Sequence, residues 1–216
     1  MGWDCHAHLF GPYDRFPLAP DRSYTPPEAP AQQYLALLER LNLSNGVLVH
    51  PSAYGEDYAL LFDALAANRN LRGVIVTGRR SALNLKILRG RGVRAARFSH
   101  RSGPAANFAG SASFDDLLAL APRLADARLH AELWTDCSVL PDIAEPLRAL
   151  PVPLVIDHMG GFDVNAGGTN NRTPAPVSAR LRAARESWWR CRALRGRRGV
   201  ARVPCSRGSS SREIAD

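Results

Sequence analysis

A repeated alternation of strand-like and helix-like segments is the feature that most constrains how this chain folds. Six short runs are predicted strands: residues 4–8, 46–50, 72–77, 92–98, 129–134 and 153–158. Five segments between them carry apolar residues at helical spacing: residues 28–42, 57–68, 81–89, 114–127 and 140–150. Strands separated by helices of about 10 to 15 residues are typical of βαβ units. The sequence therefore predicts an α/β fold with a parallel sheet.

Polar or aromatic side chains gather where the predicted strands end. These residues are His6, His8, His50, Arg97, Trp134 and His158. In α/β barrels and open parallel sheets the site is built at the carboxyl edge of the strands, so this distribution predicts a pocket there. His6 and His8 are two residues apart on one strand and project from the same face. The H-x-H spacing by itself also fits two histidines in a polar loop.

The net charge of +8 is concentrated at the end of the chain. Residues 166–216 contain 12 arginines and three acidic residues, which leaves 16 basic against 17 acidic residues in 1–165. The overall charge therefore says nothing about the function of the first 165 residues. A basic tail can bind nucleic acid or an acidic partner. We disfavour nucleic acid because aromatic residues in this tail are limited to Trp188 and Trp189 and no nucleic-acid motif is present.

Composition also limits the cellular context. The sequence contains no run of about 18 apolar residues and no basic leader followed by an apolar segment, which predicts a cytoplasmic protein that does not bind membranes. The four cysteines show no C-x-x-C spacing, so reduced thiols are expected rather than disulfides.

Several motifs together resemble one known family. They are Asp4-Cys5-His6-Ala7-His8-Leu9-Phe10-Gly11-Pro12, Phe16-Pro17, Tyr24-Thr25-Pro26-Pro27, Gly92-Val93-Arg94-Ala95-Ala96-Arg97-Phe98 and Val155-Ile156-Asp157-His158-Met159-Gly160. In this order and spacing they resemble the lactonase branch of the amidohydrolase superfamily, over about residues 3–168. The resemblance implies a TIM (β/α)8-barrel type of fold. It also implies hydrolysis of a lactone or similar cyclic ester, often one that bears carboxylates.

The resemblance also implies roles for individual residues. His6, His8 and His158 match the catalytic histidines, and Arg97 matches an arginine that binds a substrate carboxylate. Tyr24 lies in the loop that covers the site. Arg101, Trp134 and His50 are further predicted substrate contacts.

The chain also departs from the family pattern at two places. Trp134 stands where the lactonases have tyrosine. Arg97 is followed by Phe98-Ser99-His100-Arg101, whereas the usual sequence at Arg97 is Arg-Phe-Asn. In most of the superfamily the H-x-H pair binds a divalent ion, whereas the dicarboxylate lactonases are thought to work without one. A zinc or manganese ion on His6 and His8 therefore stays an open alternative to a metal-free site.

The last part of the family pattern is missing from residues 166–216. A (β/α)8 barrel takes about 250 residues, and the family motif Gly-Thr-Asp-Trp, whose aspartate is the general base, does not occur there. We predict an incomplete barrel of six strands in residues 1–165 and an arginine-rich tail in 166–216, with a helix at 178–194 followed by disorder. A frame-shifted or truncated reading frame explains this tail better than an evolved basic extension.

This incomplete pattern sets the expectation for activity. Asp136 and Asp163 lie close to the predicted rim, but neither occupies the position of the missing base. We therefore expect a lactone-binding site with impaired hydrolysis. The alternatives are a non-catalytic product, a binding module that uses the basic tail, or, within the class, a sugar-acid lactone hydrolase or lactone isomerase. Exposed edges of an incomplete sheet further predict homo-oligomers or poor solubility.

Overall fold

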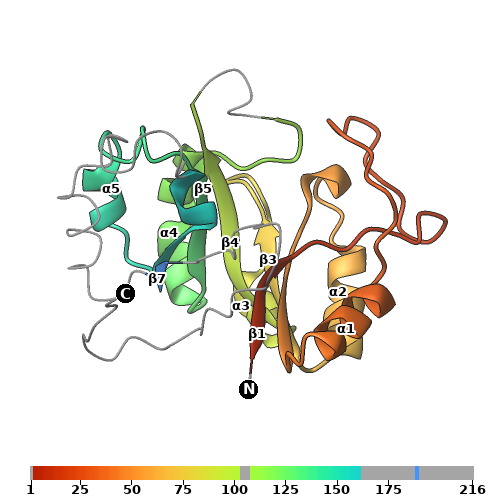
Figure 1. Ribbon diagram of the computed structural model, residues 1–216. Coiled ribbons are helices and arrows are strands. Elements are labelled where there is room, and N and C mark those ends of the chain that lie inside the picture. Colours follow the sequence, from red (N-terminus) through yellow and green to blue (C-terminus); the bar gives the residue numbers. More distant parts are fainter. Residues whose placement is uncertain (1, 103–107, 162–187, 190–216) are drawn as a thin grey trace.

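The computed structural model describes residues 2–102, 108–161 and 188–189 (Figure 1). The strands are β1 (Trp3–Ala7), β2 (Asn45–Val49), β3 (Leu71–Val76), β4 (Val93–His100), β5 (His130–Thr135), β6 (Leu154–Ile156) and β7 (Trp188–Trp189). The α-helices are α1 (Ala31–Arg40), α2 (Ala59–Ala67), α3 (Leu85–Gly90), α4 (Phe114–Asp126) and α5 (Ala144–Arg148), and short 3-10 turns are η1 (Ser52–Tyr54) and η2 (Asp157–Gly161). The six predicted strands and five predicted helices are confirmed.

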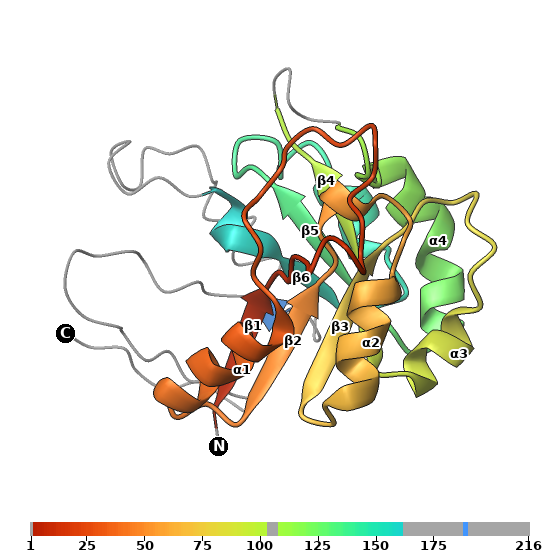
Figure 2. The ribbon, with the colours of Figure 1, turned by 90° about the vertical axis from the view of Figure 1, so that its right-hand side faces the viewer.

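All seven strands form one parallel sheet in the order β1-β2-β3-β4-β5-β6-β7. The sheet curls, and the helices that connect successive strands cover its outer face (Figure 2). This arrangement is part of an α/β barrel. Because all strands run in one direction, their carboxyl ends lie at a single rim.

Two separate apolar layers explain why the strands are continuously apolar in sequence. The larger layer fills the space between sheet and helices and includes the fully buried Leu48, Ile75 and Phe98. A smaller layer of Val49, Val74 and Ala95, with Val47 beside it, lies on the opposite, inner face. Strands buried on both faces need apolar side chains at successive positions.

The edge of β6 is covered by the two-residue strand β7. Val155 pairs with Trp188 and Ile156 with Trp189 in parallel register. At these two residues a strand replaces the helix predicted for 178–194, because pairing supplies hydrogen-bond partners for the exposed edge of β6. The rest of that predicted helix and the predicted disordered segment lie outside the described residues. None of the helices in the described part of the chain is long and apolar enough to cross a membrane.

The long loop after β1 is held against the turn that follows β2. The Gly11 amide donates to the Tyr54 hydroxyl at 2.8 Å, and the Ala19 amide donates to the Ala53 carbonyl at 2.8 Å. Phe10 forms an antiparallel bridge with Ala29. The segment between β1 and α1 therefore has a fixed path over the rim.

His50 anchors the turn after β2 from inside the core. Its side chain is 2% exposed, and its Nε2 lies 2.8 Å from the Gly55 carbonyl, so Nε2 carries the proton that donates. The ring also lies 4.6 Å from the Tyr58 ring. Burial lowers the pKa of His50 from 6.5 to about 4, and the bond to Gly55 offsets only part of this effect.

This burial predicts an acid-sensitive fold. In the unfolded chain His50 takes up a proton below about pH 6.5, whereas in the folded protein it stays neutral until about pH 4. Its contribution to stability is therefore complete above pH 6.5 and is lost progressively toward pH 4, by about 3 kcal/mol. Urea unfolding should show the free-energy difference between wild type and His50→Gln shrinking by this amount over that range. A difference that stays constant with pH would contradict the assignment.

Candidate active site

Three histidines meet at the carboxyl rim of the sheet. The His6 ring, at the end of β1, lies 5.0 Å from the His8 ring and 5.0 Å from the His158 ring, measured between centroids. His158 follows β6 in η2, where His158 and Met159 adopt left-handed backbone angles with φ of 53° and 54°. Such angles are uncommon in residues other than glycine and tend to occur at functional sites. The turn brings His158 beside the strand 1 histidines.

The proton position on His8 follows from its hydrogen bond. Its Nδ1 lies 2.8 Å from the carbonyl of Val49, the last residue of β2. A carbonyl oxygen can only accept, so Nδ1 carries a proton in this arrangement. In the neutral ring Nε2 is then the basic nitrogen, and the bond to β2 fixes the orientation of the ring.

Arg97 and Asp157 form a buried ion pair next to the histidines. Arg97 Nε donates to Asp157 Oδ2 at 2.6 Å, and the two side chains are 13% and 0% exposed. Removing either partner of such a pair leaves a buried charge and is strongly destabilising. Because Asp157 directly precedes His158, this ion pair also ties the position of His158 to β4.

Trp134 connects the histidines to two arginines. The Arg97 guanidinium carbon lies 5.1 Å from the Trp134 ring centroid, and that of Arg101 lies 4.5 Å from it. The His158 ring lies 6.2 Å from the same ring, and the Phe108 ring lies 5.9 Å from it in an edge contact. Cations at these distances from an indole are attracted to the ring. The site therefore combines a flat aromatic surface with two positive groups and a histidine cluster.

Arg101 is held in place by Asp136. Arg101 Nη2 lies 3.0 Å from Asp136 Oδ1, and the Ser102 amide and hydroxyl donate to Oδ2 at 2.9 and 3.0 Å. Burial alone would raise the pKa of Asp136, but these hydrogen bonds and the Arg101 charge hold it below its usual value. A carboxylate with a lowered pKa is a weak general base. The other candidate base, Asp163, lies outside the described residues.

Tyr24, a predicted substrate contact, lies at the outer side of the histidine cluster. Tyr24 is 41% exposed and lies edge-on to Phe10, with ring centroids 6.4 Å apart, and Phe10 in turn lies 6.3 Å from the His8 ring. Tyr24 therefore reaches the histidines only through Phe10 in the described contacts.

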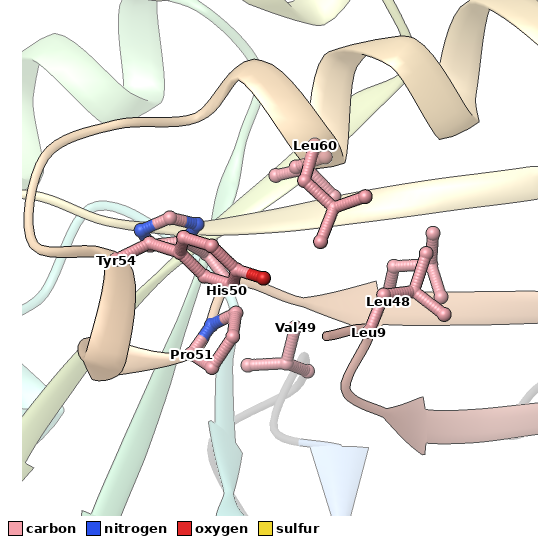
Figure 3. A pocket seen from close by; sticks show the side chains of 8 residues that line it. Leu9, Leu48, Val49, His50, Pro51, Tyr54 and Leu60 are labelled. Carbon is pink, nitrogen blue, oxygen red and sulfur yellow. The ribbon is translucent and has the colours of Figure 1, made fainter. Parts of the chain in front are cut away.

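His50 is not brought together with His6 and His158. It lines a small, mostly apolar cavity (Figure 3), whose walls are Leu9, Leu48, Val49, His50, Pro51, Tyr54, Leu60 and Leu61. The cavity holds about 10 Å³, which is room for about one water molecule and not for a lactone. The contacts of His50 in the described residues are those of a loop anchor.

Two acidic residues were missed by the sequence interpretation. The sequence motif Val155-Ile156-Asp157-His158 contains Asp157, and its position next to His158 is the signal that could have identified it. Glu132 is fully buried on β5, lies 3.5 Å from His130, and is in register with Arg97 on β4. The alternation of side chains along β5 could have indicated Glu132, since His130, Glu132 and Trp134 share one strand face.

Asp157, His6 and His158 also have the chemistry of a metal site. One ligand atom from each residue lies within 4.8 Å of the others. Imidazole nitrogens and a carboxylate oxygen are a usual donor set for zinc. His8, predicted to share a metal with His6, is not in this group of three among the described residues.

Comparisons with known proteins identify the family of the chain. Residues 3–209 match the family model described as Amidohydrolase. A 4-sulfomuconolactone hydrolase from Rhizobium radiobacter is 34% identical over 167 residues, which are 76% of this chain and 55% of the relative. A 2-pyrone-4,6-dicarboxylate hydrolase from Comamonas testosteroni is 32% identical over 166 residues, 76% of this chain and 53% of the relative. The chain spans about half the length of these curated relatives.

Solved structures show the same fold. A crystal structure from Agrobacterium tumefaciens, in the apo state, has a TM-score of 0.71 at 20% identity and covers 87% of this chain and 66% of its own. An amidohydrolase from Burkholderia multivorans with bound zinc has a TM-score of 0.55 at 15% identity, with 88% and 68% covered.

The contacts around Asp136 predict a local stability effect. Asp136→Asn removes the negative charge that pairs with Arg101 and weakens the hydrogen bonds that the carboxylate accepts from Ser102. The free energy of unfolding should therefore fall by about 1 to 2 kcal/mol in urea titrations. Asp142→Asn is the control, because Asp142 makes no ion pair in the described part of the chain. This substitution should change stability by less than about 0.5 kcal/mol. Equal effects of the two substitutions would contradict this role of Asp136.

Proposed function

Because this chain belongs to the amidohydrolase family, we propose that its site takes a lactone, or a similar cyclic ester, that carries an anionic group. The reaction is hydrolysis of the ring ester by attack of water on the carbonyl. The observation that carries this proposal is the position of Trp134, which contacts both the histidine cluster and two arginines.

The histidines provide groups for the ester carbonyl. Lactone opening needs a water from which a proton is removed and a partner for the negative charge that develops on the carbonyl oxygen. His8 Nε2 can accept a hydrogen bond from a bound water when Nδ1 donates to Val49, and donor forms of His6 and His158 can stabilise the oxyanion. We propose that these three residues surround the reacting carbonyl.

The arginines provide groups for the substrate anion. A guanidinium binds a carboxylate or sulfonate through charge-assisted hydrogen bonds, and Trp134 offers a flat surface for an unsaturated ring. The names of the two curated relatives support this substrate class, since they denote a sulfo-substituted lactone and a pyrone dicarboxylate. Tyr24 is proposed as an outer contact from the loop above His8.

A divalent metal fits the same residues. His6, Asp157 and His158 would hold it, as their donor atoms and spacing allow, and the superfamily often uses such an ion. When bound, a metal of this kind polarises an ester carbonyl and lowers the pKa of a bound water. Whether zinc, manganese or no metal serves this site is decided by elemental analysis of protein purified without chelators.

The base that completes the family reaction has no counterpart in the sequence after His158. No Gly-Thr-Asp-Trp motif occurs in residues 166–216, and Asp136 is engaged with Arg101. We therefore propose that this chain binds acidic lactones but turns them over slowly. Sugar-acid lactones and lactone isomerisation are alternatives within the class, and tests on a small lactone panel separate them.

The first test measures binding of 2-pyrone-4,6-dicarboxylate by calorimetry. Arg97→Met should weaken binding about 10- to 100-fold, because it removes hydrogen bonds to a charged group worth about 1.5 to 3 kcal/mol. Arg148→Met is the control, since Arg148 pairs with Glu145 on α5 and not with the site. Absence of measurable binding by the wild type, or equal loss in both variants, would contradict the proposed substrate class.

The second test measures turnover of the same lactone by absorbance, with and without added Zn²⁺ or Mn²⁺. We expect rates little faster than the uncatalysed reaction, because residues 166–216 contain no counterpart of the aspartate that activates water. Loss of a positioned base alone lowers the rate about 10²- to 10⁴-fold. Turnover of about 1 to 1000 per second, abolished by His158→Ala, would show instead that another group has replaced the missing aspartate.

A further inference from the structure

We propose that Arg97 and a divalent metal ion compete for the carboxylate of Asp157. In this proposal Asp157 has two alternative cationic partners, and metal binding releases Arg97 to hold the anionic group of a substrate. The inference rests on the proposed site but concerns metal affinity. It is measured without a lactone, so its failure and the failure of the proposed substrate class are distinguishable.

The geometry places Asp157 within reach of both partners. Its Oδ2 accepts from Arg97 Nε at 2.6 Å, and the residue belongs to the group of three whose ligand atoms lie within 4.8 Å of one another. Two ligands of one zinc ion, each about 2.0 to 2.2 Å from the metal, lie at most about 4.4 Å apart. His6, Asp157 and His158 are thus close to the spacing that zinc requires.

Each of the two partners weakens binding of the other for electrostatic reasons. A guanidinium that donates a charge-assisted hydrogen bond to a carboxylate neutralises part of its negative charge, so the carboxylate attracts a second cation less strongly. The Arg97 charge also repels a cation at the histidines, and this repulsion is weakly screened because Asp157 is fully buried and Arg97 is 13% exposed. Arg97 therefore lowers metal affinity in two ways: through its hydrogen bond to Asp157 and through repulsion of a cation at the histidines.

A neighbouring arginine provides a matched comparison. Arg101 lies against the same Trp134 ring as Arg97, and it also pairs with an aspartate, but its partner is Asp136. Asp136 is not in the group that could ligate a metal in the described residues. A substitution of Arg101 removes the same charge from the same rim and leaves the partner of Asp157 in place.

The experiment measures Zn²⁺ affinity of the full chain by competition with a fluorescent chelator. Arg97→Met should raise the affinity about tenfold or more, and Arg101→Met should change it less than about threefold. Asp157→Asn should lower the affinity at least tenfold, as expected for loss of a ligand. In the Asp157→Asn background the effect of Arg97→Met should shrink to that of Arg101→Met, because only repulsion remains.

Two outcomes would overturn the proposal. Equal effects of Arg97→Met and Arg101→Met would show that only general charge matters, and an unchanged affinity in Asp157→Asn would show that Asp157 is not a ligand.

A thermal readout covers the case in which Arg97→Met is poorly folded. This variant leaves Asp157 buried without its arginine, so added Zn²⁺ should raise its melting temperature more than that of the wild type. A smaller or equal rise would count against the proposal. If Arg97→Met does not fold with or without Zn²⁺, the affinity of Asp157→Asn decides.

Discussion

The ion pair between Arg97 and Asp157 is the interaction on which the rest of the site depends. Arg97 on β4 is in register with Glu132 on β5, and Glu132 is in register with Val155 on β6, two residues before Asp157. The pair therefore crosses β5 and joins the two strands on either side of it. Because both charges are largely out of water, neither group tolerates the loss of the other. This constraint fixes the end of β6 and, with it, the position of His158.

The turn after β6 completes this arrangement. The Cys137 amide donates to the Gly160 carbonyl at 2.6 Å, and a Cβ at Gly160 would meet the Cys137 sulfur at 2.9 Å. Gly160 has a φ of 66°, so both the backbone angle and the close approach favour glycine. The loops after β5 and β6 are thus packed as one unit. That packing holds His158 near His6 while Trp134 lies beside it.

The sequence was informative where one local rule decides the structure. Continuous apolar runs identified the strands because both faces of a parallel sheet are covered, and histidines at strand ends converge because all carboxyl ends share one rim. His50 also follows the end of a strand, but it lies apart from the histidine cluster because its ring turns toward Gly55 and Tyr58. The partnership of Arg97 with Asp157 spans 60 residues and depends on the curl of the sheet, which no local pattern contains. The strand at Trp188 and Trp189 likewise depends on an exposed edge elsewhere.

The pairing of both arginines bears on which substrates the proposed site selects. Arg97 and Arg101 each already hold a carboxylate, so a substrate anion gains only the difference between its own contact and the one it displaces. The Arg101–Asp136 pair is partly open to water, whereas the Arg97–Asp157 pair is largely buried. A substrate anion therefore displaces Asp136 from Arg101 more easily than Asp157 from Arg97. A weakly charged or neutral ester offers no compensation for either exchange. Under the proposed function, we therefore expect the site to discriminate by charge. It should favour rings whose anionic group reaches an arginine while the ester carbonyl meets the histidines.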